Sequence, residues 1–183
     1  KVTSQTAQNT LRDMWIYYGG TSLSHKHRDT LTLGMDAYGF DIAPDLGEPE
    51  QKTYQPNRFQ WVKTTISHNT VLVNEKEQPN YTVNGNPLHF EDAGAVKVMD
   101  IEAPGVYNET SQYRRTVVMV EASDDVSYSV DFFRVKGGKH HTYSFHSQAE
   151  NAVPLSGLDF TTKWDEDGNY ITGAQVAKET DEY

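Results

Sequence analysis

Residues 114–135 have the sequence RRTVVMVEASDDVSYSVDFFRV. Val and Thr are frequent in residues 114–121, and apolar residues alternate with polar ones in residues 126–135, as is typical of β-strands. The polar run Ser123-Asp124-Asp125 between them predicts a turn. We therefore expect a hairpin here, followed by a turn at Lys136-Gly137-Gly138 and a returning strand over residues 140–146.

The same kind of pattern continues toward both ends of the chain. Residues 30–38 alternate apolar and polar side chains, and Asn84-Gly85 between two short apolar runs is a hairpin signal. Residues 7–15 contain the one candidate helix. Further strands are predicted over residues 40–43, 70–74, 81–83, 87–90, 95–101 and 170–171. Many short strands with turns at this spacing predict an all-β, mostly antiparallel β-sandwich, which occupies residues 1–183 as a single domain.

The composition excludes several classes of protein. A chain of 183 residues is the size of one domain, and the lack of Cys rules out disulfide bonds and thiolate metal sites. There are 16 Lys and Arg residues and 26 Asp and Glu residues, so the net charge is −10. This charge argues against nucleic acid as a partner. The longest apolar runs hold about five residues, whereas a membrane-spanning helix needs roughly 20, so we also expect no membrane span.

Histidine motifs stand at the predicted entries of two strands. His25 and His27 are separated by one residue, so their imidazoles face the same side of an extended chain. They either share one site, or one binds a metal while the other performs acid–base chemistry. His68 precedes another strand, and Asp45 lies in a turn after the strand that follows His27. Imidazole and carboxylate groups suit Zn²⁺, and three protein ligands leave a fourth position open.

Several short motifs follow one another in a recognisable order. The segments are His25-Lys26-His27-Arg28-Asp29, Ala37-Tyr38-Gly39, Pro44-Asp45-Leu46-Gly47, Ser67-His68-Asn69-Thr70, Tyr113-Arg114-Arg115, residues 131–138, His140-His141 and Ser144-Phe145-His146. In this order they resemble the β-sandwich region of the heparinase II/III-like polysaccharide lyases. One departure is Leu46, which stands where that family has the proline of an Asp-Pro-Gly-like turn.

The resemblance implies an eliminative mechanism for cutting polysaccharides that contain uronic acids. A base removes the proton at C5 of the uronate and an acid protonates the departing O4, while neutralisation of the carboxylate stabilises the carbanion-like state. By position, His25 is similar to the catalytic histidine that the sandwich contributes. The resemblance also implies a mainly structural zinc ion held by His27, Asp45 and His68. A zinc-bound histidine needs an oriented hydrogen-bond partner, and Asp29 or Asn69 fits this role.

The resemblance further implies a partner domain, a substrate and a location. In this family the active site lies between the sandwich and an N-terminal α/α toroid, which supplies a catalytic Tyr and an Asn or His. These 183 residues lack such a toroid. We therefore expect the C-terminal part of a larger lyase, inactive alone, with residues 1–18 as a candidate linker. The substrate is then an acidic polysaccharide, such as a heparan-type glycosaminoglycan or alginate, and the protein is periplasmic or secreted in a bacterium.

Two alternatives remain open on the residues alone. One is a non-catalytic β-sandwich that binds carbohydrate or supports another domain, with aromatic residues such as Trp61 stacking on sugar rings. The same aromatic residues also fit core packing. The other is a small cupin-like metal enzyme, although no Glu follows His25-Lys26-His27 at the usual spacing. The pair His140-His141 fits a solvated strand start.

Overall fold

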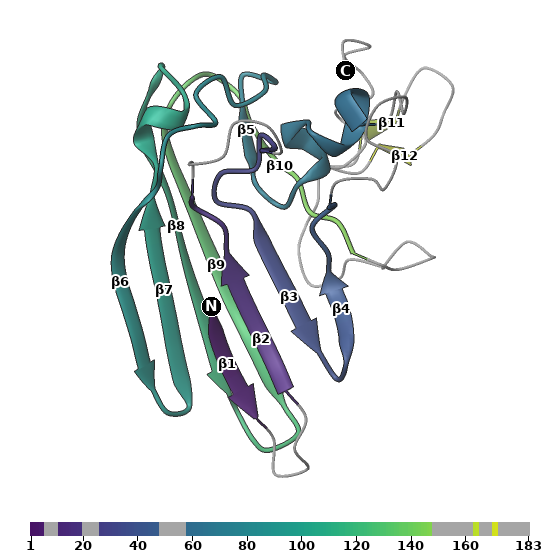
Figure 1. Cartoon of the computed structure of the whole chain (residues 1–183), viewed down its shortest axis with the longest axis vertical. Coiled ribbons are helices and arrows are strands. Elements are labelled where there is room, and N and C mark those ends of the chain that lie inside the picture. The colour runs from purple at the N-terminus through teal and green to yellow at the C-terminus, as the bar shows by residue number, and fades with distance from the viewer. Residues whose placement is uncertain (6–10, 20–25, 48–57, 148–162, 165–169, 172–183) are drawn as a thin grey trace.

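The computed structural model describes residues 1–5, 11–19, 26–47, 58–147, 163–164 and 170–171. These residues form antiparallel strands and three short helical turns (Figure 1). The predicted all-β class is confirmed, since the described residues contain no α-helix. None of the helices among them is long and apolar enough to cross a membrane.

The first sheet contains four strands in the order β1-β2-β3-β4. They are β1 (Val2–Gln5), β2 (Leu11–Ile16), β3 (Leu33–Ala37) and β4 (Phe40–Ala43). Val2, Met14 and Ile16 are buried. Residues 1–18, the candidate linker, thus contribute two strands to this sheet.

The second sheet is a four-stranded meander in the order β6-β7-β8-β9. Its strands are β6 (Asn86–Ala93), β7 (Val96–Glu102), β8 (Thr110–Glu121) and β9 (Ser127–Gly137). The predicted hairpin over residues 114–135 is confirmed as the β8–β9 pair, which closes with Glu121 opposite Ser127.

Short elements lie at the upper end of the two sheets in Figure 1. β5 (Val71–Val73) pairs with β10 (His141–Tyr143), and β11 (Lys163–Trp164) pairs with β12 (Tyr170–Ile171). The helical turns are Arg58–Val62, Thr65–Ser67 and Pro104–Val106.

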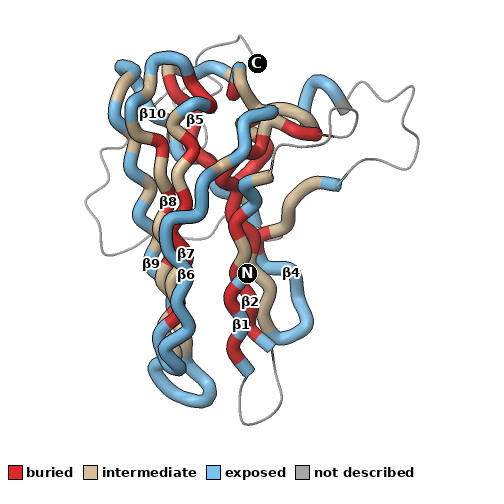
Figure 2. The backbone as a smooth tube through the Cα atoms, turned by 60° about the vertical axis from the view of Figure 1, so that its left-hand side comes forward, coloured by how far each residue is buried: buried red, intermediate tan, exposed pale blue. Residues whose placement is uncertain are grey.

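The core lies between the two four-stranded sheets, where buried residues face each other (Figure 2). The first sheet contributes Met14 and Leu33, and the second contributes Met99, Tyr113 and Val117. Burial of each such side chain stabilises the fold by about 1.5–3 kcal/mol relative to exposure. One continuous core therefore joins both sheets into a sandwich.

The candidate helix over residues 7–15 is wrong where the structure describes it. Residues 11–16 form β2, which pairs with β1 on one side and β3 on the other. The ring of Trp15 lies over Gly34 of β3, where even a Cβ atom would clash with it. This cross-strand packing overrides local propensity, which is only a weak guide.

The hairpin predicted at Asn84-Gly85 is also wrong. Residues 81–83 form no strand, and β6 instead pairs with β7 across a turn that contains Gly94, whose φ is 73°. The backbone N–H of Gly85 donates to the Tyr18 carbonyl over 2.7 Å, and a Cβ at Gly85 would lie 2.8 Å from the Tyr18 side chain. This glycine therefore serves a close approach of two segments.

Candidate metal centre

Four side chains of the types that bind metal ions meet at the end of the sandwich where β3 begins and β4 ends. His27, Asp29, Asp45 and His68 each present one donor atom, and these atoms lie within 4.8 Å of one another. Three of the residues are buried, and Asp45 is half-buried. The rings of His27 and His68 have centroids 5.2 Å apart. The structure thus brings together the three residues that the sequence assigned to a metal, and it adds Asp29.

His68 is oriented so that one ring nitrogen faces the cluster. Its Nε2 lies 3.1 Å from the carbonyl oxygen of Val62, which can only accept, so Nε2 carries a hydrogen and donates it. Its Nδ1 lies 2.5 Å from Oδ1 of Asp45. In a neutral imidazole with its hydrogen on Nε2, Nδ1 carries a lone pair, and here that lone pair faces a carboxylate oxygen. The contact is therefore favourable only with a proton or a cation between the two atoms.

Asp29 brings a second carboxylate into the same buried space. Its Oδ1 is buried and has no hydrogen-bond partner among the described residues. Burial of a carboxylate without a partner is costly. The pKa of Asp29 is accordingly raised to about 6: burial is the main cause, the charge of His68 opposes the rise, and the charge of Asp45 adds to it. A cation bound at this position would stabilise the ionised carboxylate of Asp29.

The pKa of His68 is shifted by opposing effects. Burial lowers the pKa because it disfavours the charged ring, but the hydrogen bond from Nδ1 to Asp45 and the charges of Asp45 and Asp29 raise it. The net direction is upward. Two carboxylates around one imidazole therefore give this pocket a strong preference for positive charge.

The comparisons with known proteins identify the family of this chain. Residues 16–180 match the family model described as Heparinase II/III-like, C-terminal. The chain belongs to this family. A comparison with curated proteins gave no match.

Solved structures share the fold of this heparinase II/III-like domain. The "Heparinase III-BT4657 gene product" has a TM-score of 0.57 at 23% identity, over 69% of this chain and 19% of that one. Its form with methylated lysines gives 0.56 at 22% identity over the same shares. The "Crystal Structure of Heparinase III" gives 0.51 at 19% identity, over 86% of this chain and 23% of that one. The chain thus spans about a fifth of the length of these structures, and identities this low show the fold alone.

The Ser67-His68-Asn69-Thr70 segment is fixed to the residues that precede β3. The side-chain amide of Asn69 donates to the Leu33 carbonyl, and its backbone N–H donates to Thr32 Oγ1. The Thr70 hydroxyl donates to the Thr30 carbonyl over 3.0 Å. The residues that flank His68 therefore hold its segment against the one that carries His27 and Asp29.

The side chain of Gln78 strengthens this connection by bonding the backbone of Thr30. Its side chain is fully buried and pairs with both backbone groups of Thr30: the Thr30 N–H donates to Oε1 over 2.8 Å, and Nε2 donates to the Thr30 carbonyl over 2.9 Å. Nε2 also donates to the hydroxyl of Tyr113, which in turn donates to the Val71 carbonyl. Because the Gln78 amide and the Tyr113 hydroxyl are paired, the network fixes the backbone near the candidate metal centre.

Arg115 of β8 joins the two ligand-bearing segments from inside the sandwich. It is fully buried, and Nη1 donates to the carbonyls of Leu31 and Asn69. Nε and Nη2 donate to the two carboxylate oxygens of Asp131, and Nη2 also donates to the Tyr143 hydroxyl. All five guanidinium N–H donors are thus used. Leu31 itself has a φ of 63°, an unfavourable value for a branched residue, and Arg115 holds it there.

The sequence identified part of this centre. His27, Asp45 and His68 lie together, whereas the predicted catalytic residue His25 lies outside the described residues. The side chain of Asn69, expected as a partner of a ligand, instead donates to the Leu33 carbonyl and accepts from the His146 backbone N–H. The roles of Gln78 and Arg115 were missed, because neither residue stands near the motif in the sequence. The one signal in the sequence that could have identified them is a polar residue inside a stretch that otherwise reads as strand or core.

Proposed function

We propose that His27, Asp29, Asp45 and His68 bind a zinc ion. The observation that carries the proposal is the convergence of four donor atoms within 4.8 Å, including a buried Asp29 oxygen without a hydrogen-bond partner among the described residues. Nitrogen and carboxylate donors are a usual zinc set. The Val62 carbonyl supports the assignment, because it fixes the hydrogen on Nε2 of His68 and leaves Nδ1 to face the ion.

A set of four protein donors fits a structural ion. Structural zinc sites are closed, whereas catalytic ones keep a position for water or substrate. The ion would hold the segments around His27, Asp45 and His68 together and so add to folding free energy. These segments then form the rigid support on which neighbouring residues act.

We infer that the domain belongs to a larger lyase that cleaves uronate-containing polysaccharide by β-elimination. Membership of the heparinase II/III-like family supports this reaction. His25 would move a proton during elimination, in which the C5–H and C4–O4 bonds of the sugar break and a C4–C5 double bond forms. The remaining catalytic groups would come from an α/α toroid, so the isolated chain would be inactive. The family further favours a periplasmic or secreted bacterial protein.

Elemental analysis of the purified chain tests the metal site. We expect about one zinc per chain, and loss of this zinc in the His27→Ala and His68→Ala variants. His89→Ala is the matched control, because His89 is an exposed histidine that lies 3.8 Å from Glu91 and outside the His27–His68 cluster. Zinc retained in both cluster variants, or lost equally in the control, would contradict the assignment.

Turnover of the full-length protein tests the lyase function separately. The unsaturated uronate that elimination creates absorbs ultraviolet light, so cleavage is followed directly. We expect His25→Ala to abolish product formation while zinc content and melting temperature stay unchanged. Full activity in this variant would refute the catalytic role of His25.

A further inference from the structure

The outer face of the second sheet carries a continuous apolar patch. Along β8, buried residues alternate with residues that face away from the core. The strand register continues these outward positions onto β7 and β9, in rows that run across the sheet. Three rows supply seven apolar side chains, which we call the outer patch: Val96, Val120 and Tyr128; Val98, Val118 and Val130; and Phe132, opposite Thr116.

The side chains of the outer patch are open to solvent. Tyr128 and Phe132 are 54% and 51% exposed, and Val96 and Val130 are 39% and 38% exposed. The other three valines are half-buried by these neighbours. The two rows nearest the β8–β9 turn hold only apolar residues on β7, β8 and β9. A contiguous apolar surface with a polar border is typical of a site of protein contact.

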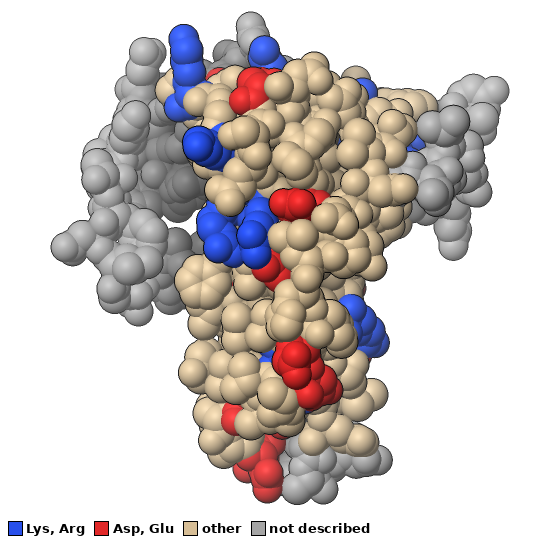
Figure 3. All heavy atoms as spheres, turned by 90° about the vertical axis from the view of Figure 1, so that its left-hand side faces the viewer, with Lys and Arg blue, Asp and Glu red and all other residues tan. Residues whose placement is uncertain are grey.

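Charged residues border the outer patch on the side toward the metal centre. Arg115, which contacts the segments of that centre, precedes the patch residues of β8. Beside it lies a row of three charged residues, one from each strand: Glu102, Arg114 and Arg134. Figure 3, which views the molecule from the β6 side, shows Lys and Arg side chains next to Asp and Glu side chains at mid-height. The acid of β7 and the base of β9 thus lie on opposite sides of β8.

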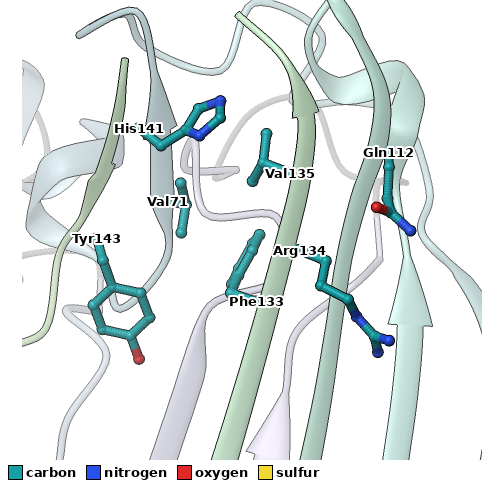
Figure 4. A pocket seen from close by; sticks show the side chains of 7 residues that line it. All are labelled: Val71, Gln112, Phe133, Arg134, Val135, His141 and Tyr143. Atoms are coloured by element: carbon teal, nitrogen blue, oxygen red, sulfur yellow. The ribbon is translucent and has the colours of Figure 1, made fainter. Parts of the chain in front are cut away.

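Arg134 is available to an acidic partner on this outer face. Figure 4 shows its side chain pointing away from Phe133, which faces the opposite side of β9. Its Nη2 donates to Thr116, and it forms no direct ion pair among the described residues. Asp100, the nearest acid, already accepts two hydrogen bonds from Arg114. One carboxylate therefore serves two guanidinium groups, and Arg134 keeps donors for a further carboxylate.

This face is complementary to a second copy of itself. A two-fold axis along β8 keeps each row at its height and exchanges the two sides, so β7 of one copy faces β9 of the other. Glu102 then meets Arg134 of the partner subunit, and this pair occurs twice. The valines of β7 meet the aromatic residues of the partner's β9, and Val118 lies near the axis. Strands of the two sheets run in nearly the same direction, as in aligned sheet packing.

The size of the face sets the strength of such a contact. The sheet has four strands, and β7 has seven residues. Spacings of about 4.8 Å between strands and about 3.4 Å between residues give roughly 450 Å² per copy. Two copies then bury about 900 Å², close to the roughly 1,000 Å² at which specific interfaces begin. The contact is therefore reversible, with a dissociation constant of about 10 µM.

We propose that the outer face of β7, β8 and β9 is the interface of a symmetric dimer of this domain. The outer patch forms its centre, and the pairs of Glu102 with Arg134 of the partner subunit form its rim. Because the axis runs along the strands, both metal centres lie at the same end of the dimer. The proposal rests on neither the metal site nor the lyase reaction.

Sedimentation velocity of the purified 183-residue chain tests the interface. We expect a reversible monomer–dimer equilibrium between about 1 and 200 µM. Val130→Lys places a charge inside the outer patch and should weaken association at least tenfold, because a desolvated charge without a partner opposes contact. Ile42→Lys is the matched control, since Ile42 is 39% exposed on β4 of the other sheet and Val130 is 38% exposed. The control should associate like the parent chain.

A charge exchange tests the two-fold arrangement itself. Glu102→Lys and Arg134→Glu each put like charges opposite one another in the homodimer and should weaken association about tenfold. In an equimolar mixture of the two variants, both contacts regain opposite charges. The mixture should therefore associate about as well as the parent chain. A variant that had merely lost its fold would not recover on mixing, and melting temperatures check this directly.

Four results would overturn the proposal. They are a chain that stays monomeric at the highest concentration, equal weakening by Val130→Lys and Ile42→Lys, and a mixture that associates no better than its components. The fourth is a full-length protein that is monomeric where the 183-residue chain dimerises, which would show that another domain of the same protein covers this face. Zinc content and lyase activity are measured separately, so none of these results bears on the proposed function.

Discussion

Replacing Arg115 by Met removes the buried cation that joins the segments around the metal centre. The variant keeps most of the side-chain volume but none of the five N–H donors. It removes a donor from the Leu31 and Asn69 carbonyls, of which Asn69 keeps the Leu33 backbone N–H, and it leaves Asp131 without its charge partner. Leu31 and Asn69 are fully buried, and Asp131 is half-buried.

The expected loss of stability follows from these contacts. A buried acceptor that loses its donor costs about 1–3 kcal/mol, and removal of one partner of a buried ion pair costs about 3–5 kcal/mol. Contacts within one network are not additive, and Asp131 keeps 18% of its side-chain exposure, so solvent replaces part of the pairing. We expect about 4 kcal/mol in total, a large share of the roughly 5–15 kcal/mol that stabilises a typical domain.

Urea unfolding measures this loss, and the neighbouring arginine provides the control. Arg114→Met makes the same exchange one position earlier, where the side chain faces outward and pairs with Asp100. It should cost less, because the Arg114 side chain is 30% exposed and the buried Asp100 keeps the Thr116 hydroxyl as a donor. Arg115→Lys keeps the charge but supplies three donors instead of five, so its stability should fall between those of the parent and Arg115→Met.

The reasoning fails if Arg115→Met costs less than about 1 kcal/mol, or no more than Arg114→Met. A second readout separates a local role from a general one. At urea concentrations where both variants remain folded, Arg115→Met should also bind zinc more weakly than Arg114→Met. Equal zinc affinity would show that Arg115 stabilises the sandwich without positioning the metal centre.

Three further results are expected. Chelation of zinc should lower the melting temperature of the parent chain but not that of His68→Ala, since the ion adds folding free energy only where its ligands are complete; equal shifts would contradict this. Zinc affinity, measured against a competing chelator, should fall as the pH is lowered from 7.5 to 5.5, because Asp29, with its pKa raised to about 6, and His68, whose pKa is raised above its usual value, must each lose a proton to bind the ion; the same affinity at both pH values would contradict this set of ligands. Gly94→Ala should cost about 1 kcal/mol in unfolding experiments because φ is positive there. Gly137→Ala should cost clearly more, because its φ is 111° and its Cβ would also overlap the Glu109 backbone; equal costs would show that the overlap relaxes.

The hairpins of the second half were predictable because local signals and tertiary structure agree there. Residues 114–135 combine strand-forming side chains with a polar turn, and β8 and β9 form at that place. Residues 11–16 show the opposite case. They become a strand because β1 and β3 lie on either side of them and Trp15 covers Gly34, and both facts depend on residues far along the chain.

The candidate site was predictable to the same limited extent. Residue chemistry pointed to a metal set of histidines and Asp45, the resemblance to the family selected His27, Asp45 and His68, and the structure places these three together. Asp29 was predicted only as a hydrogen-bond partner of a zinc-bound histidine, because a sequence does not show which way a carboxylate points. Arg115 could not be assigned, because an arginine next to another arginine in a strand does not reveal which of the two faces inward.

The network around Arg115 also constrains when the metal centre can form. Arg115 lies 84 positions after Leu31 and 46 after Asn69. During synthesis, all four candidate ligands therefore leave the ribosome before the residue that fixes their segments. Domains rich in such distant contacts fold in milliseconds to seconds, much more slowly than helical bundles. A nascent chain would thus carry its histidines and carboxylates apart until β8 has been made, and the ion would enter an already closed scaffold as one of the last steps of maturation.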